Sequence, residues 1–379
     1  MRRVHFLWIG IALLAAALLV TLYETHEVVL PNSTCVPCHG VTIFTEEIMD
    51  ESRGAFTGPD ACEPCHAYAY HRWTKSDHCR AMMGPAPSTI AGHFSADTVE
   101  YSYRDFHSAM ILRDGKYFMI APNKNGQPEE FPIHLALGIR DQQALLTKFP
   151  DGRYQILPTA YDIRNQTWFE SSEGIVRTTH MLRPNEPFYW TNWKRTWNYD
   201  CFGCHLSGME KNYDPETNTY NTKWRDLGID CEACHGPGRA HARLRTVKKL
   251  WGGLVRDTTM LRLTSLSPRQ QVETCGACHA SKSTLALGYK PGDDWTEYYT
   301  LTLLDHDFIM PDGRYAGLIY DLIGFMQSPC YEKGGLTCIT CHSGHADERS
   351  IELRHYEHQN DMCRPCHTDK VENPQAHTF

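Results

Sequence analysis

Seven short motifs of cysteine and histidine stand out in this sequence of 379 residues, and each reads Cys-x-x-Cys-His. Numbered one to seven along the chain, they are Cys35-Cys38-His39, Cys62-Cys65-His66, Cys201-Cys204-His205, Cys231-Cys234-His235, Cys275-Cys278-His279, Cys338-Cys341-His342 and Cys363-Cys366-His367. Two thiols at this spacing can each add to a vinyl group of one haem, and the adjacent histidine can bind its iron. The motifs therefore predict seven covalently attached haems c, with fourteen cysteines as attachment points and seven histidines as iron ligands.

Paired cysteines have two other common uses in proteins, zinc binding and disulfide formation. The pairs of motifs three and four have a spacing that suits a zinc ribbon, and an exported chain could join such cysteines in disulfides. Neither structure needs a histidine directly after the second cysteine, and here it follows in all seven motifs. The sequence therefore favours haem attachment over zinc or disulfides.

The number of motifs links this chemistry to electron transfer. Seven haems in 379 residues is about one haem for every 54 residues, so each haem must lie close to another. Close haems make a path for electrons. The net charge of −8 argues against a nucleic-acid partner.

The chain is expected to have four regions, of which the first is a signal-anchor at residues 1–23. Residues 4–23 carry no formal charge and are mostly apolar, and two arginines precede them, which predicts an N-terminal transmembrane helix. A cleaved signal peptide is the alternative. In both cases the haem region would lie on the periplasmic side of the inner membrane, either anchored there or exported after cleavage.

The other three regions follow from where the motifs lie. Residues 24–96 form an N-terminal two-haem region, and residues 181–379 form a five-haem core with short helices around each motif. Residues 97–180 lack motifs, and their apolar runs alternate around Asp114-Gly115 and Asp151-Gly152, which predicts hairpins in a small β-rich insertion. The expected fold class is mainly α with little regular structure, packed around haems.

Several longer stretches carry a family resemblance. They are Cys62-Glu-Pro-Cys65-His66, Trp73, Ser76-Asp-His78-Cys79-Arg-Ala-Met82, Phe149-Pro-Asp-Gly-Arg-Tyr-Gln-Ile-Leu-Pro158, Trp197-Asn-Tyr-Asp-Cys201, Trp224-Arg-Asp-Leu-Gly-Ile-Asp-Cys231-Glu-Ala-Cys234-His235-Gly-Pro-Gly238, Phe325-Met-Gln-Ser-Pro-Cys330 and Cys338-Ile-Thr-Cys341-His342-Ser-Gly-His345. From Asp60 onward the sequence resembles the cytochrome c554 and c-prime family, especially its larger multihaem relatives. The resemblance implies haems with histidine on both faces, packed in touching pairs.

The resemblance also implies which histidines bind iron on the distal face. His78, His241 and His345 look like the family's distal ligands, and His377 resembles its C-terminal one. Some relatives carry histidine where this chain has Glu170 and Tyr189, and His180 is the candidate replacement. Other open candidates, from haem-ligand chemistry alone, are His26, His107, His134, His306, Met82, Met83 and Met209.

Two functions remain open at this stage. The first is a membrane-tethered periplasmic heptahaem carrier that conducts electrons between a quinol-linked membrane donor, or another cytochrome, and a periplasmic or outer acceptor. The alternative is an oxidoreductase that acts on small nitrogen or sulfur compounds at one haem with an open coordination position. The sequence has no Cys-x-x-Cys-Lys motif, a mark of nitrite-reducing haems, and no catalytic residue is predicted.

Two features lie outside the motifs. Cys79 and Cys330 are left over, and an exported protein seldom keeps two unpaired thiols, so a disulfide between them is expected. Two free buried thiols and thiolate ligation of iron are the alternatives.

A basic stretch can serve either as a solvated helix face or as charge balance for haem propionates; its residues are Arg239, His241, Arg243, Arg245, Lys248, Lys249 and Arg256.

Overall fold

The computed structural model describes residues 55–172, 180–251, 259–302, 310, 322–345, 359–373 and 375. The first motif, the apolar segment at residues 4–23 and His377 lie outside these residues. The chain divides into two compact units. The main unit comprises Gly58–Gly236 with Leu261–Phe379, and the second unit comprises Met1–Thr57 with Pro237–Met260.

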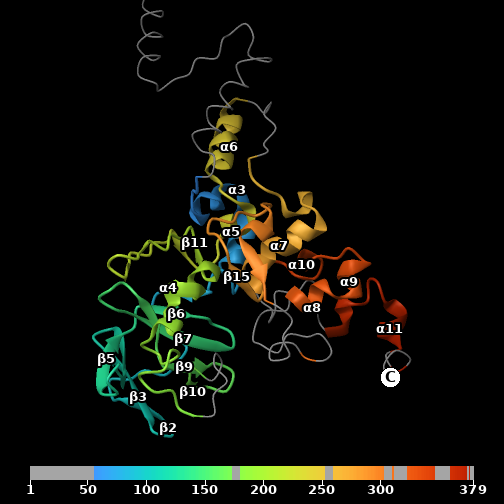
Figure 1. Cartoon of the computed structure of the whole chain (residues 1–379). Helices are drawn as coiled ribbons and strands as arrows, with labels where there is room; N and C mark the ends of the chain where they lie inside the picture. The colour runs from blue at the N-terminus through green and yellow to red at the C-terminus, as the bar shows by residue number, and fades with distance from the viewer. Residues whose placement is uncertain are drawn as a thin grey trace, which may run out of the picture. The chain divides into compact units, whose positions relative to one another are not determined.

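The regular elements of the described residues are short helices and many strands (Figure 1). The helices are α3 (Glu63–Trp73), α4 (Trp197–Asp200), α5 (Cys231–His235), α6 (Arg239–Trp251), α7 (Pro268–His279), α8 (Leu322–Met326), α9 (Pro329–Glu332), α10 (Cys338–Cys341) and α11 (Thr368–Glu372). The 3-10 helices are η2 (Pro59–Ala61), η3 (Trp193–Arg195), η4 (Cys201–Cys204), η5 (Leu263–Ser265), η6 (Trp295–Glu297) and η7 (Gln359–Met362). Apart from α6, all of them belong to the main unit.

Most strands belong to two antiparallel sheets. The larger sheet has the order β1-β6-β7-β9-β10 with β8 paired to β7, and the other has the order β2-β3-β4-β5. Their strands are β1 (Met82–Met83), β2 (Val99–Tyr103), β3 (Phe106–Arg113), β4 (Lys116–Pro122), β5 (Pro128–Pro132), β6 (Leu135–Leu137), β7 (Gln142–Lys148), β8 (Tyr154–Ile156), β9 (Thr159–Asp162) and β10 (Thr167–Glu170). Three two-stranded ribbons pair β11 (Leu206–Ser207) with β14 (Asp226–Leu227), β12 (Tyr213–Asp214) with β13 (Thr219–Tyr220), and β15 (Lys282–Thr284) with β16 (Tyr299–Leu301).

The larger sheet has a hydrophobic core on each face. Successive side chains of a strand point to opposite sides, so one strand can contribute to both cores. Leu145 packs into a core shared with the four-stranded sheet, which includes Met110 and Met119. Its neighbour Leu146 packs into a second core with Trp197 and Phe202. Since Phe202 lies inside motif three, the second core ties that motif to the sheet.

A turn of the larger sheet adds a second connection to motif three. Asp151-Gly152 joins β7 to β8, and Gly152 has φ of +82°. A Cβ at Gly152 would lie 1.8 Å from the backbone oxygen of Tyr220, so only glycine permits this approach. Asn198, fully buried just before motif three, donates to the Gly152 carbonyl and to Thr222 and accepts from the Tyr154 N–H.

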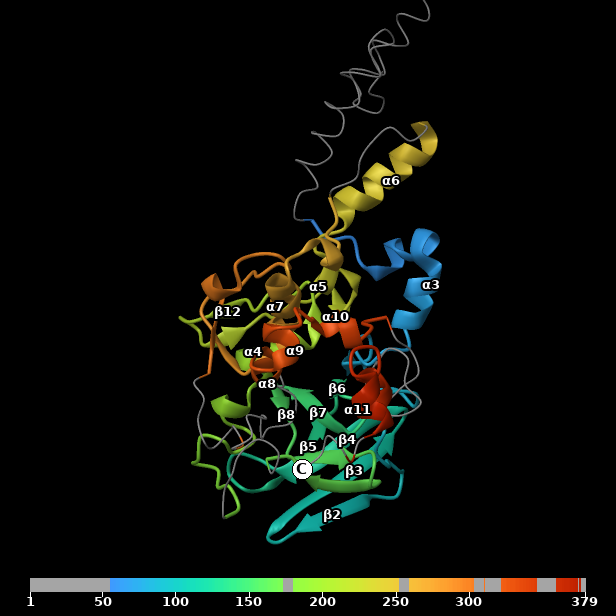
Figure 2. The same ribbon diagram turned by 90° about the vertical axis from the view of Figure 1, so that its right-hand side faces the viewer.

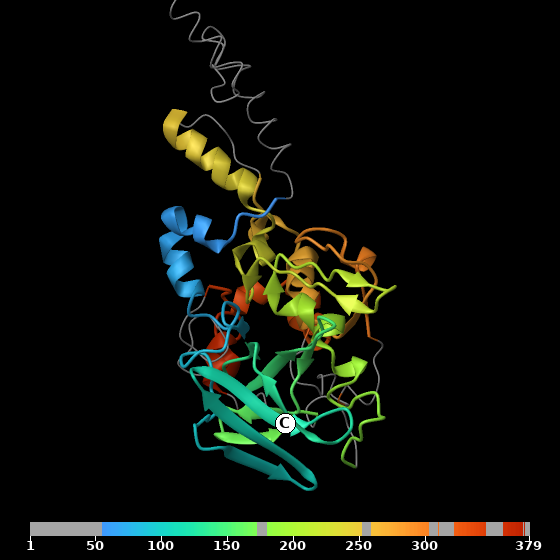
Figure 3. The same ribbon diagram turned by 90° about the vertical axis from the view of Figure 1, so that its left-hand side faces the viewer.

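The prediction of a mainly α fold is wrong. The described helices are mostly four or five residues long, because several serve only to form one motif, whereas strands run almost continuously from Val99 to Glu170. The insertion is therefore a two-sheet region, and β1, which precedes it in the sequence, pairs with β6 of its larger sheet. The Asp114-Gly115 and Asp151-Gly152 turns are present as predicted. Figures 2 and 3 show the sheets at one end of the main unit and α5, α7 and α10 towards the other.

Among the described residues, no helix is long and apolar enough to cross a membrane. The transmembrane helix expected at the N-terminus therefore has no counterpart there, and its residues are outside the described part of the chain. The expected boundaries at residues 23, 96 and 180 stay predictions.

Candidate haem-binding site

Each described motif is built on a single helical turn. The backbone N–H of the motif histidine donates to the carbonyl of the first cysteine in motifs two, six and seven, at 2.9, 2.8 and 2.8 Å. In motifs four and five the turn is part of α5 and of the last turn of α7. Residues three and four positions apart share one face of a helix, so both sulfurs and the imidazole can face one haem.

The helix before motif five is defined by its own sequence. Ser267 accepts from the backbone N–H of Gln270, whose side chain accepts from the Ser267 N–H, and Pro268 occupies the first turn. This capping box satisfies N–H groups that a helix N-terminus leaves without partners. Gly276 packs against Leu322 of α8 so closely that a Cβ would lie 2.8 Å from its side chain.

Sulfur atoms of different motifs lie together in the main unit. Hydrogen bonds join Cys62 to Cys231, Cys204 to Cys278 and Cys275 to Cys338, which connects motif two to four, three to five, and five to six. The contact with Cys278 lowers the pKa of the Cys204 thiol to about 7.

Weaker electrostatic effects extend the same connections. The Cys234 sulfur acts on Cys275 and Cys278, which links motif four to five. Burial and the sulfurs of Cys330, Cys363, Cys338 and Cys366 raise the pKa of Cys341, which links motif six to seven. The described motifs thus follow the order two, four, five, six, seven, with motif three beside motif five.

These thiols stand in for the thioether sulfurs of attached haem, which neither titrate nor donate hydrogen bonds. The contacts therefore serve as a measure of proximity. Each thioether sulfur lies at the edge of its macrocycle, so motifs whose sulfurs touch would carry neighbouring haems.

Two predicted distal histidines lie opposite motif histidines of other segments. The ring centres of His78 and His279 are 6.1 Å apart with perpendicular planes, and those of His235 and His345 are 6.1 Å apart with planes at 23°. Metal–imidazole nitrogen bonds are about 2 Å long, so two imidazoles on opposite sides of one metal have ring centres roughly 6.3 Å apart. Both pairs thus have the separation that one iron between them requires.

The surroundings of both pairs favour iron binding. His235 Nδ1 lies 3.0 Å from the carbonyl of Leu261, so this nitrogen donates and leaves Nε2 for a metal. The loop of His78 is tied to the strand before motif four, because the N–H of Ile229 donates to the His78 carbonyl at 2.8 Å. Gly228 permits that approach: its φ is +76°, and a Cβ would lie 2.1 Å from the Cys79 carbonyl oxygen.

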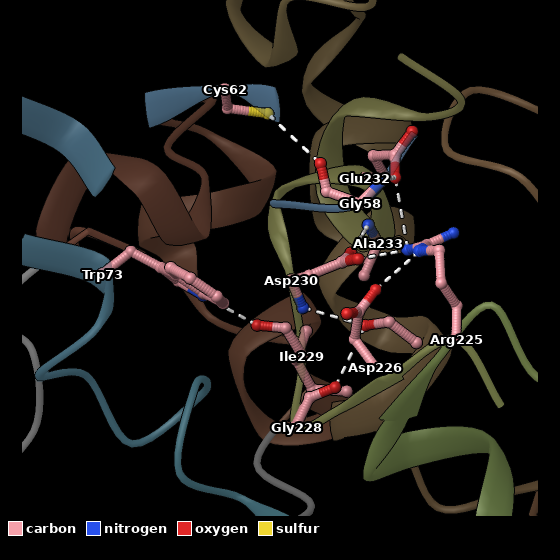
Figure 4. Close-up of polar contacts among 11 residues, drawn as sticks. Gly58, Cys62, Trp73, Arg225, Asp226, Gly228, Ile229, Asp230, Glu232 and Ala233 are labelled. Carbon is pink, nitrogen blue, oxygen red and sulfur yellow. Dashed lines mark hydrogen bonds and ion pairs between the residues drawn. The ribbon is translucent and has the colours of Figure 1, made fainter. Parts of the chain in front are cut away.

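A buried charged cluster joins motifs two and four (Figure 4). Arg225 pairs with Asp226, Asp230 and Glu232, and the last two side chains are fully buried. Asp230 also accepts from the N–H of Ala233 and caps α5, while Glu232 accepts from the N–H of Gly58 at 2.9 Å. We call these four side chains the Arg225 cluster, and it fixes the segment that leads into Cys62 against motif four.

The remaining predicted ligands have different surroundings. His205 is half-buried, and desolvation together with His279 lowers its pKa to about 4. Its Nδ1 has no hydrogen-bond partner in the described part of the chain. His180 is exposed and contacts Glu186 at 2.8 Å. His241 is half-buried on α6 of the second unit. His66, His342 and His367 are exposed in their motifs.

The two leftover cysteines are not joined. Cys79 and Cys330 are both free thiols, so the expected disulfide is not present. Burial raises the pKa of Cys79, while Cys330 is exposed and lies near Cys341. Of the alternatives, two free thiols agree with the structure, although only Cys79 is shielded.

Comparison with known proteins supports the class that the motifs predict. The model of the family "Cytochrome c554 and c-prime" matches residues 177–236, which contain motifs three and four and the whole Arg225 cluster. The chain is a multihaem c-type cytochrome. No curated protein matches it.

Two solved structures are similar to this cytochrome. The crystal structure of the outer cell wall cytochrome OcwA is 19% identical with a TM-score of 0.51, over 82% of this chain and 67% of that one. An undecahaem cytochrome from the S-layer of Carboxydothermus ferrireducens is 16% identical with a TM-score of 0.42, over 86% of this chain and 46% of that one. The first likeness supports the fold of the cytochrome. Cytochromes of this class carry covalently bound haem c and exchange electrons with redox partners.

Sequence reasoning missed the residues that support the motifs. The family pattern includes all four residues of the Arg225 cluster, but it does not indicate that they pair with one another. Only Asp230 has a local signal, because an Asp directly before a helix is a usual N-cap. The contact between Glu232 and Gly58 spans 174 residues and has no local signal.

Proposed function

We propose that this cytochrome is an exported electron carrier with seven haems c. It would conduct electrons between a quinol-linked donor at the membrane and a periplasmic or outer acceptor. The observation that carries this proposal is the series of neighbouring cysteine sulfurs from motif two to motif seven. Hydrogen bonds link motif two to four and motif five to six, and weaker electrostatic effects link motif four to five and motif six to seven. A series of neighbouring haems has no use in a single-site enzyme unless electrons travel along it.

The two histidine pairs support electron transfer rather than catalysis. We assign His78 as distal ligand to the haem of motif five and His345 to the haem of motif four, from their positions opposite His279 and His235. Two imidazoles fill both axial positions of an iron, which leaves no site for a substrate and keeps the geometry alike in both oxidation states. Such haems suit transfer of electrons rather than bond chemistry. His180, His241 and His377 remain proposed ligands for other haems.

The haem network would branch at motif five, so that electrons could leave the carrier at more than one haem. Motif five has sulfur neighbours in motifs three, four and six, so its haem would be the junction of the network. Motifs two, three and seven are then the ends within the described residues.

Voltammetry of the purified haem protein on an electrode tests the carrier function. A carrier gives reversible waves from all its haems, and addition of nitrite, hydroxylamine or sulfite leaves them unchanged. A sustained catalytic current with any of these compounds would instead support the oxidoreductase alternative. Fractionation of cells that make the natural full-length protein tests export, since an intact cytoplasmic apoprotein would contradict it.

A further inference from the structure

Arg72 joins the helix of motif two to the proposed distal ligand of another haem. It lies in α3, one residue before the end of the helix that contains Cys65 and His66, and it is half-buried. Its Nε donates to the backbone carbonyl of His345 at 3.2 Å, although the two residues are 273 positions apart. His345 is the histidine whose ring faces His235 of motif four. An arginine of the motif-two helix therefore contacts the residue that would complete the haem of motif four.

The guanidinium of Arg72 has a second contact that orients it. Tyr68 lies one turn earlier in α3, and residues four positions apart share a face of a helix. Arg72 Nη1 donates to the Tyr68 hydroxyl at 2.7 Å, and the guanidinium carbon lies 5.4 Å from the centre of the Tyr68 ring. Because guanidinium nitrogens form a rigid planar fork, a bond through Nη1 also limits where Nε can point. Tyr68 thus directs Nε towards the His345 carbonyl.

The carbonyl of His345 is an effective place to hold this ligand. The residue lies in a short segment after motif six, with only Ser343 and Gly344 between it and His342. A histidine binds iron more firmly when less conformational freedom is lost on ligation. A hydrogen bond to the backbone of the ligand itself removes part of that freedom in advance.

The other proposed distal ligand has the same type of support. The His78 carbonyl accepts from the N–H of Ile229 at 2.8 Å, and Ile229 lies two residues before Cys231 of motif four. His78 is assigned to motif five and His345 to motif four. In the order two, four, five, each ligand is therefore held by a segment of the preceding motif.

We propose that Arg72 is a positioning residue that keeps His345 on the iron of the motif-four haem. The inference rests on the proposed assignment of His345 as that ligand. Loss of one hydrogen bond from a charged donor should make the bond between iron and His345 open about tenfold more often. A ligand that stays bound in both oxidation states keeps electron exchange between the haems of motifs two and four fast, because no ligand must move with each electron.

Carbon monoxide binding to the reduced, complete haem protein measures how often His345 leaves the iron. This gas binds a ferrous haem only at an open axial position, so its apparent affinity rises in proportion to the open fraction. Arg72→Gln should raise the affinity of one haem about tenfold, and Tyr68→Phe, which removes only the orienting hydroxyl, should raise it less. Arg113→Gln is the matched control, because it removes a guanidinium that pairs with Glu130 on the four-stranded sheet; it should leave the affinity unchanged.

The double variant shows which haem opens. At a gas concentration that saturates Arg72→Gln, His345→Ala should bind one more carbon monoxide per chain than the original protein. Arg72→Gln combined with His345→Ala should bind the same amount, because both changes open the same haem. A second additional molecule in the double variant, or an unchanged affinity in Arg72→Gln, would overturn the inference. If His345→Ala binds no additional gas, the ligand assignment itself is wrong and the inference falls with it. A haemochrome assay of each preparation separates these results from loss of haem.

Discussion

Replacement of Glu232 by glutamine tests whether the Arg225 cluster holds two haem motifs together. Glutamine keeps the shape of the side chain and one oxygen that can accept from the Gly58 N–H, now at 2.9 Å. It removes the negative charge that lies 3.3 Å from Arg225 and can place an amide N–H against the guanidinium. The change therefore isolates the charge of the cluster.

The expected loss of stability depends on the burial of the cluster and on the partners that Arg225 keeps. Breaking a buried ion pair outright costs about 3–5 kcal/mol. Arg225 keeps Asp226 and Asp230, so the cost should fall to that of an impaired buried hydrogen bond to a charged group, about 1–3 kcal/mol. Loss of one negative charge near motifs two and four should also raise the potential of at least one haem.

Urea unfolding at neutral pH, followed by far-ultraviolet circular dichroism, measures the stability change. Glu130→Gln is the control: Glu130 pairs with Arg113 at 2.7 Å on an exposed strand, where such pairs contribute about 0–1 kcal/mol. Equal losses in the two variants, together with unchanged haem potentials, would refute the structural role of the Arg225 cluster.

Three further predictions concern the cofactors and thiols. A pyridine haemochrome assay should find seven haems per chain that resist extraction with acidified acetone, and five or fewer would contradict the motif assignment. His345→Ala should convert one low-spin haem to high-spin, and an unchanged spectrum would remove His345 from the ligand set. Labelling of the denatured, unreduced protein should find two reactive thiols, Cys79 and Cys330, and finding none would show that they are bridged.

The chemistry of the chain was predictable because it is local. A Cys-x-x-Cys-His motif needs one helical turn, and its residues are adjacent in sequence. His78 and His345 were predicted as ligands from a family resemblance, and the structure places each opposite a motif histidine. Which motif each would face could not be predicted, since 201 residues separate His78 from His279 and 110 separate His235 from His345.

The fold class was not predictable for a related reason. A run such as Ala144-Leu145-Leu146 has no alternation, and only the sheet shows that its side chains enter two different cores. Short motif helices were expected to dominate, yet the described strands contain nearly as many residues as the described α-helices, because each motif needs so little helix.

Anomalous diffraction at the iron edge from crystals of the haem protein tests the central claim most directly. It locates every iron without reference to the protein model. We expect iron neighbours in the order of motifs two, four, five, six and seven, with the iron of motif three beside that of motif five. We also expect one iron between His78 and His279 and another between His235 and His345. An iron of motif five that has no neighbour in motif four or six would contradict the proposed electron path.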